Sequence, residues 1–213
     1  MMSDTKQRLI DGVLVVLREQ GLMGVSARSV GAAAGANQAL VFYHYGSVDD
    51  LIAAACRQEN SARVAAYAER FAAVGTLREL LQVGRELHAT ELREGNVSVL
   101  AQMLAAGQRN GRLAEVTAEG LNRWVAEIEK VLERLLEGSP VAEVADVPGL
   151  ARAVAAAFVG VELYEGVDAA GAERALASLD QLAVLIEVVD ELGPLARRAL
   201  RSRIKRAGMP RPS

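Results

Sequence analysis

Residues 26–45 read SARSVGAAAGANQALVFYHY, and this stretch decides the fold of the chain. Ser26 can accept a backbone N–H and so begin a short helix over 27–34. Gly35 tolerates a positive φ at a sharp turn, and Asn37 can cap a second helix that runs to the end of the stretch. Because alanines crowd the connection, the two helices can approach closely, as a helix-turn-helix requires. The second helix is then the one expected in a DNA major groove.

This pattern resembles the TetR family of bacterial transcription regulators. The family has a capped helix, Ala-Ala-Gly, a short apolar residue and Ser, then Lys-Gly, an aromatic-rich ending and Gly-Ser. Here residues 33–47 read AAGANQALVFYHYGS, and the resemblance extends from the helix near Leu9 to about Leu51. The family often has Lys where Gln38 and Val48 stand and Tyr where Phe42 stands, so three phosphate donors are missing. The resemblance implies a dimer, an inducer site in the larger domain and, usually, repression.

Composition favours an all-α protein, because the apolar residues are mostly Ala, Leu and Val and alternating strand patterns are scarce. The single cysteine, Cys56, excludes an intramolecular disulfide and suits a reducing cytoplasm. No uninterrupted apolar run of about 18 residues occurs, so no membrane span is predicted. The polar start lacks the apolar core of a signal peptide.

The predicted organisation is an N-terminal three-helix helix-turn-helix domain over 1–47 and a larger helical ligand-binding and dimerisation domain over 48–196. A linking helix over 48–73 opens the larger domain. The last two apolar segments carry more apolar surface than one face of a monomeric helix needs. We favour a homodimer through them over burial in a single-chain core. The further helices are expected over 77–93, 97–106, 113–137, 150–167 and 173–192.

The tail over 197–213 carries seven cations and no acidic residue. A solvated terminus is favoured over an auxiliary phosphate contact, because chain ends are commonly poorly ordered. The whole chain has a net charge of −3, so any DNA binding must come from a local face.

The first 46 residues hold four cations against three carboxylates, a net charge of only +1. Contacts with the DNA phosphates must therefore come from backbone amides at helix N-termini and from neutral donors. By resemblance, the phosphate-contacting positions fall on Tyr43 and His44 and the base-facing positions on Gln38 and Ala39. Gln38 can pair with adenine, and Ala39 can pack on a thymine methyl. The predicted DNA-binding residues are Ser26, Arg28, Asn37, Gln38, Ala39, Tyr43, His44 and Ser47.

Three aromatic residues in this stretch have rival interpretations. For Phe42 and Tyr45, core packing is favoured over DNA contact. For His44, two interpretations are open: packing within the N-terminal domain over 1–47, which we call the head, and a phosphate contact.

Nothing in the sequence indicates catalysis, so we expect no enzyme, no cofactor and no metal. His44 and His88 lie far apart without ligand spacing, and no phosphate loop or nucleophile motif occurs. Polar groups inside apolar segments instead suggest a small-molecule pocket, which is mostly apolar with a few directed polar groups. For Trp124 and Phe158 the alternative is plain core, and for Glu162 an exposed or dimer surface. The predicted ligand-binding residues are His88, Gln102, Met103, Trp124, Phe158 and Glu162.

Together these features predict a cytoplasmic, homodimeric repressor of transcription that binds double-stranded DNA. A small hydrophobic or amphipathic effector would release it from the DNA. Two heads about 34–36 Å apart would read a palindromic operator. One alternative is a helical binding or scaffold module that has lost operator recognition. The other is an all-α enzyme acting on a lipophilic substrate.

Overall fold

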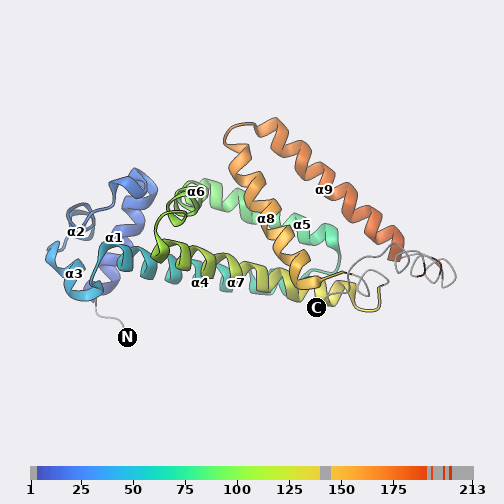
Figure 1. The fold of residues 1–213 in the computed structure, drawn as a ribbon, viewed down its shortest axis with the longest axis horizontal. Coiled ribbons are helices and arrows are strands. Elements are labelled where there is room, and N and C mark those ends of the chain that lie inside the picture. The colour runs from blue at the N-terminus through green and yellow to red at the C-terminus, as the bar shows by residue number, and fades with distance from the viewer. Residues whose placement is uncertain (1–3, 140–144, 191–192, 194–198, 200–201, 203–213) are drawn as a thin grey trace. The chain divides into compact units, whose positions relative to one another are not determined.

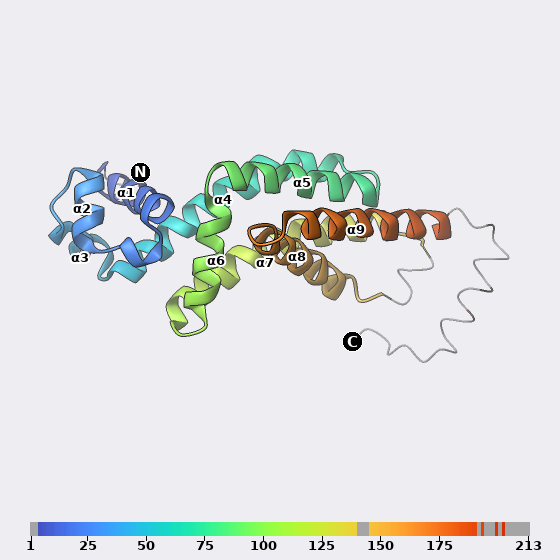
Figure 2. The same ribbon diagram turned by 90° about the horizontal axis from the view of Figure 1, so that it is seen from above.

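A computed structural model of the chain describes residues 4–139, 145–190, 193, 199 and 202. Over these residues the protein is helical and contains no strand, which confirms the predicted all-α class (Figures 1 and 2). The predicted limits of the helices over 27–34, 48–73 and 77–93 are confirmed, and the other helices begin and end within a few residues of prediction. Most of the basic tail lies outside the described residues. The elements are α1 (Asp4–Gln20), η1 (Leu22–Gly24), α2 (Ala27–Ala34), α3 (Ala39–Tyr45), α4 (Val48–Ala73), α5 (Leu77–Arg93), α6 (Asn96–Gly107), α7 (Gly111–Leu136), α8 (Val147–Glu165) and α9 (Ala169–Asp190).

The chain forms two compact units, whose limits fall inside helices α4, α5 and α7. Unit 1 consists of Met1–Ala66 and His88–Arg123, and unit 2 of Tyr67–Leu87 and the chain from Trp124 onward. The domain limits predicted from the sequence, at residues 47 and 196, stay a prediction.

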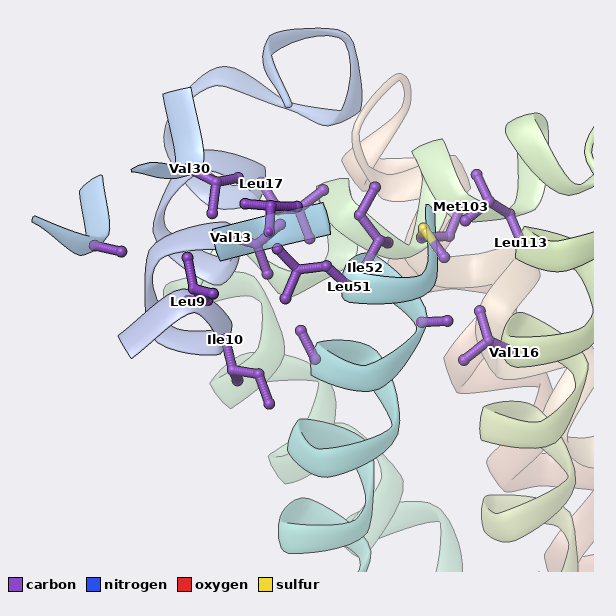
Figure 3. Packing of buried hydrophobic residues seen from close by; sticks show 14 residues of the cluster. Leu9, Ile10, Val13, Leu17, Val30, Leu51, Ile52, Met103, Leu113 and Val116 are labelled. Carbon is purple, nitrogen blue, oxygen red and sulfur yellow. The ribbon is translucent and has the colours of Figure 1, made fainter. Parts of the chain in front are cut away.

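Unit 1 contains a continuous apolar core to which α1, α2, α3, α4, α6 and α7 contribute (Figure 3). Helix α1 buries the stripe that its helical spacing predicts, from Leu9 through Val13 and Val16 to Leu17. Full burial of such a side chain contributes about 1.5–3 kcal/mol relative to exposure. The short helices α2 and α3 are therefore held by tertiary packing, because helices of eight and seven residues have little stability alone.

Two glycines allow α1, α2 and the start of α3 to lie in contact. A Cβ at Gly12 would lie 3.0 Å from the Cβ of Ala34, and one at Gly31 would lie 2.9 Å from the carbonyl oxygen of Ala36. The sequence predicts a close approach, but it assigns this role to alanines. In the structure Gly12 and Gly31 also lie at points of close approach, where they meet Ala34 and Ala36.

Unit 2 has its own apolar core, formed by the end of α4 with parts of α5, α7 and α8. Helices α8 and α9 are joined by a short turn and contact each other, and Figure 1 shows them diverging from that turn. Helix α9 leaves Leu182, Val184, Leu185 and Val188 exposed, whereas α8 exposes Tyr164 and the turn between the two helices exposes Val167. Among the described helices, α8 is long and apolar enough to cross a membrane by length and composition alone. This is weak evidence for a span, because apolar helices of soluble proteins share that composition.

Candidate nucleic-acid interface

The connection between α2 and α3 has the predicted helix-turn-helix caps. The Ser29 N–H donates to Ser26 Oγ at 3.1 Å, and the Ser26 N–H donates back to Ser29 Oγ at 2.9 Å. Gly35 has φ 58° and ψ 40°, the left-handed conformation that glycine adopts without strain. Asn37 Oδ1 accepts the Ala39 N–H at 2.9 Å, which caps α3. These local bonds fix where α2 ends and where α3 begins.

Helix α3 has one packed side and one open side. Val41 is fully buried, whereas Gln38, Ala39, Phe42 and Tyr43 are exposed, and Tyr43 retains 80% of its surface. The exposed residues are spaced at i, i+1, i+4 and i+5, so they share one side of the helix. We call these four residues the α3 face. A short helix that is anchored on one side and open on the other has the form that groove insertion requires.

Core packing is the interpretation favoured above for Phe42 and Tyr45. It is confirmed for Tyr45 and wrong for Phe42. The Tyr45 hydroxyl donates to the carbonyl oxygen of Lys6 at 2.9 Å, and partial burial raises the pKa of Tyr45. Phe42 is 53% exposed and lies on the α3 face. Helical periodicity is the signal that distinguishes them, because Val41 and Tyr45 are four residues apart on the packed side.

The remaining predicted DNA-binding residues surround this face with different degrees of exposure. Ser26, Arg28 and Asn37 are exposed, and His44 is half-buried with its ring edge-to-face against Tyr43 at 4.9 Å. Both interpretations of His44, packing and phosphate contact, stay open.

Ser47 caps the start of α4. Its hydroxyl donates to Asp50 Oδ2 at 2.7 Å and accepts the Asp50 N–H at 3.0 Å. The hydrogen bond from Ser47, with a further contribution from Arg112, lowers the pKa of Asp50. Since the Ser47 proton is already donated, a phosphate at this position would meet backbone N–H groups of α4 rather than that hydroxyl.

Two arginines of the head make their bonds within the protein. Arg18 pairs with Glu59 at 2.7 Å and donates to Asn96 Oδ1 at 3.1 Å. Arg8 donates to the carbonyl oxygen of Ala34. Arg28 is exposed, and its side chain makes no hydrogen bond or ion pair with any described residue. Of the three arginines of the head, Arg28 is therefore the one whose guanidinium is not bonded within the described part of the chain.

The predicted ligand-binding residues are divided between the two units. In unit 1, His88 is buried on α5, and Met103 lies in the apolar core with Leu113 (Figure 3). Gln102 Oε1 accepts the Leu22 N–H of η1 at 2.5 Å. The Gln102 amide therefore holds the turn that follows α1.

In unit 2, Trp124 contacts the rings of Tyr67 and Phe71, with centroids 6.1 and 6.3 Å away. Phe158 of α8 lies so close to α5 that a Cβ at Gly84 would overlap its ring. Glu162 is half-buried on α8. The structure therefore brings His88, Gln102 and Met103 into one unit and the other three into the second.

No group of three or more His, Cys, Asp or Glu side chains placed to hold a metal occurs among the described residues. Burial raises the pKa of the Cys56 thiol to about 11, so this cysteine is a thiol at neutral pH.

No protein-family model matches the sequence, and no curated protein matches it significantly. Solved structures match most of the chain. The multidrug binding protein EbrR complexed with proflavin is 29% identical, with a TM-score of 0.57 over 83% of this chain and 99% of EbrR. NemR of E. coli in its reduced form is 15% identical, with a TM-score of 0.70 over 84% and 97%. A provisionally named TetR-family transcriptional regulator from Rhodococcus sp. is 20% identical, with a TM-score of 0.68 over 89% and 100%. The resemblance to the TetR family is confirmed, and the chain has that family's fold.

Proposed function

We propose that this chain is a DNA-binding transcription regulator of the TetR type that reads a palindromic operator as a homodimer. The observation that carries this proposal is the α3 face, an open helix side held in a capped helix-turn-helix. The likeness to solved structures supports it: the provisionally named TetR-family transcriptional regulator from Rhodococcus sp. matches along its whole length at 20% identity, and the multidrug binding protein EbrR along almost its whole length at 29% identity.

Direct base reading is assigned to two residues of the α3 face. The Gln38 amide can make two hydrogen bonds with adenine, and the Ala39 methyl can pack on thymine. A good two-point base contact contributes about 1–3 kcal/mol of discrimination. Phe42, on the same face, is available for a further apolar contact.

The phosphate contacts are assigned to groups around this face. They combine the exposed hydroxyl of Tyr43, the ring of His44, the Arg28 guanidinium and the N-terminal amides of the helices that Ser26 and Ser47 cap. Helix N-termini favour phosphate because their N–H groups are unpaired and the dipole is positive there.

Selection of bound fragments from genomic DNA tests the proposal, because it requires no knowledge of the operator. On a recovered fragment, Gln38→Ala is expected to weaken binding at least about fivefold, from the loss of 1 kcal/mol or more. Tyr43→Phe, which removes only a hydroxyl, is expected to weaken it less. Gln108→Ala is the matched control, since Gln108 is exposed at the end of α6. Failure to recover any fragment at low salt would contradict DNA binding.

The dimer is proposed to form through α8 and α9. Helix α9 exposes large apolar side chains, Leu182 and Leu185 among them, and α8 exposes Tyr164 and buries few residues within the chain. Contiguous apolar surface of this kind marks interaction sites. Packing α8 and α9 against a second copy would give a four-helix interface.

Sedimentation equilibrium at micromolar concentration tests the dimer. Leu185→Asp is expected to give a monomer, because it places a charge in the apolar contact. Leu92→Asp on α5 is the matched control, since Leu92 is exposed to a similar extent outside α8 and α9. A monomeric wild type, or equal dissociation of the two variants, would contradict this interface.

Effector release is proposed to start in the larger helical domain, for which the six predicted ligand-binding residues remain the candidates. A ligand that prefers one conformation shifts the population toward it, and a few kcal/mol of preference is enough. The EbrR complex contains proflavin, a planar aromatic cation. In this chain, Trp124 with Tyr67 and Phe71 supplies aromatic surface suited to such a molecule.

Proflavin is therefore the first probe. Trp124 is the only tryptophan, so quenching of its fluorescence reports binding near it. We expect quenching together with release of the selected DNA fragment. Quenching without release of the DNA fragment would contradict release by this class of ligand. The absence of quenching would argue against an aromatic cation as effector.

A further inference from the structure

One arginine of α1 is bound to the helix-turn-helix backbone. Arg8 Nε and Nη2 donate to the carbonyl oxygen of Ala34 at 3.1 and 2.7 Å, and Nη2 also donates to the carbonyl oxygen of Gly35. These carbonyls stand at the C-terminal end of α2, 26 and 27 residues away in sequence. The guanidinium thus joins α1 directly to the turn.

The end of α2 needs such a donor. The last carbonyl groups of a helix have no partner within it and carry partial negative charge, so a cation there is favourable. The forked guanidinium can serve two carbonyl oxygens at once. By fixing the peptide groups of Ala34 and Gly35, Arg8 fixes the direction in which the chain leaves α2.

That direction determines where α3 begins. The Ala36 N–H donates to the carbonyl oxygen of Gly31 at 2.9 Å, and Asn37 then caps α3. Gln38, the first residue of the α3 face, follows Gly35 by three residues, and only these bonds lie between it and the carbonyl groups that Arg8 contacts. A rotation of the Gly35 peptide would therefore move the whole face.

The guanidinium of Arg8 also has its other groups engaged within the protein. Asp4 lies 4.0 Å from Arg8 Nη1, and Nε and Nη2 are already bonded to carbonyl groups. Arg28 differs, because it is exposed and makes no bond with described residues. The two arginines therefore have different functions although both belong to the head.

We propose that Arg8 is a positioning residue for DNA recognition, which sets the turn between α2 and α3 and does not contact phosphate. This inference rests on the proposed DNA-binding function. It extends that function to a residue whose charge alone would suggest a phosphate contact.

Salt dependence of DNA affinity distinguishes the two roles. The logarithm of affinity falls with the logarithm of salt concentration by about 0.9 for each phosphate contact. On a fragment recovered from genomic DNA, Arg8→Ala should weaken binding on the order of tenfold and leave the salt slope unchanged. The loss is expected because binding sites tolerate shifts of only about 0.5 Å. Arg28→Ala, the matched control, should reduce the slope by about 0.9 per head.

Arg8→Lys provides a second discrimination. A lysine keeps the charge and suffices for a phosphate, but it lacks the planar fork that bonds two carbonyl groups. Arg8→Lys should therefore resemble Arg8→Ala if the role is positioning. Wild-type affinity in Arg8→Lys, or a reduced slope in Arg8→Ala, would overturn the proposal.

Hydrogen exchange of the DNA-free protein makes the test independent of the operator. In Arg8→Ala, the amides of residues 36–41 should exchange on the order of tenfold faster, while those in the middle of α4 stay protected. Unchanged exchange over 36–41 would refute the positioning role. Faster exchange in a protein that retains no DNA fragment would refute the proposed function and leave the structural role of Arg8 supported.

Discussion

Gly31→Ala should weaken DNA binding on the order of tenfold and also lower stability by about 1 kcal/mol. A Cβ at residue 31 would lie 2.9 Å from the carbonyl oxygen of Ala36 and 3.1 Å from the backbone nitrogen of Gln38. Ordinary contacts begin at 3.4 Å, so the turn must move by about 0.5 Å. Both contacted atoms belong to the backbone, so no flexible side chain can absorb the shift. The start of the α3 face would move instead.

Two opposing terms set the stability change. Alanine improves helix propensity over glycine by about 0.8–1 kcal/mol. Overpacking a tight contact costs about 1–3 kcal/mol. The net loss is then about 1 kcal/mol, which lowers the melting temperature of a chain of this size by about 2–4 °C. Because recognition tolerates misplacement of only about 0.5 Å, affinity should fall on the order of tenfold.

Gly120→Ala is the control, since a Cβ there would meet only the Asn60 side chain, whose nearest atom, Nδ2, lies at an ordinary 3.5 Å. This variant should melt a few degrees higher, by about 2–4 °C for 1 kcal/mol, with DNA affinity unchanged. Thermal melting by circular dichroism and fluorescence anisotropy with a selected DNA fragment measure the two effects. The reasoning fails if Gly31→Ala melts higher than wild type and binds DNA equally well.

Three further predictions concern other bonds of unit 1. Gln102→Ala leaves a partly buried N–H of η1 without its acceptor, so it should cost about 1–3 kcal/mol in chemical unfolding, whereas Gln108→Ala should cost almost nothing. The hydrogen bond from Arg57 lowers the pKa of Glu119, so its stabilisation is present above the ordinary pKa of 4.5 and is lost as the pH falls below it. In Glu119→Gln, the free energy of unfolding should therefore fall less as the pH drops below 4.5 than it does in wild type. The difference should be small, because the carboxylate is partly exposed to solvent. An unchanged dependence of stability on pH would contradict the pairing. Cys56, with a pKa of about 11, should react slowly with iodoacetamide at pH 8 in the native protein and rapidly after denaturation, and equal rates would contradict its burial.

Local sequence signals predict the elements of the head well. Ser26, Gly35 and Asn37 act within three residues of themselves, so their caps and the turn could be predicted without any knowledge of the fold. The apolar period of α1 likewise predicts its buried side. The exposed side of α3 could have been predicted too, since the period that buries Val41 and Tyr45 exposes Phe42.

Contacts between distant residues could not be predicted in this way. Arg8 and the carbonyl oxygen of Ala34 are 26 residues apart, and Gln102 and Leu22 are 80 apart. Sequence alone offers many partners of equal chemistry for a guanidinium or an amide. The same limit applies to the effector residues, because their division between two units depends on where α4, α5 and α7 cross from one unit to the other.

The contact of Phe158 with Gly84 has a consequence for the evolution of this protein. The ring occupies the space that a larger residue at position 84 would need, so such a residue requires the Phe158 ring to move or to be replaced by a smaller side chain. Among descendants of this gene, gain of a side chain at position 84 should accompany a smaller residue at position 158. Such paired replacement would identify the crossing of α5 and α8 from alignments of related sequences alone.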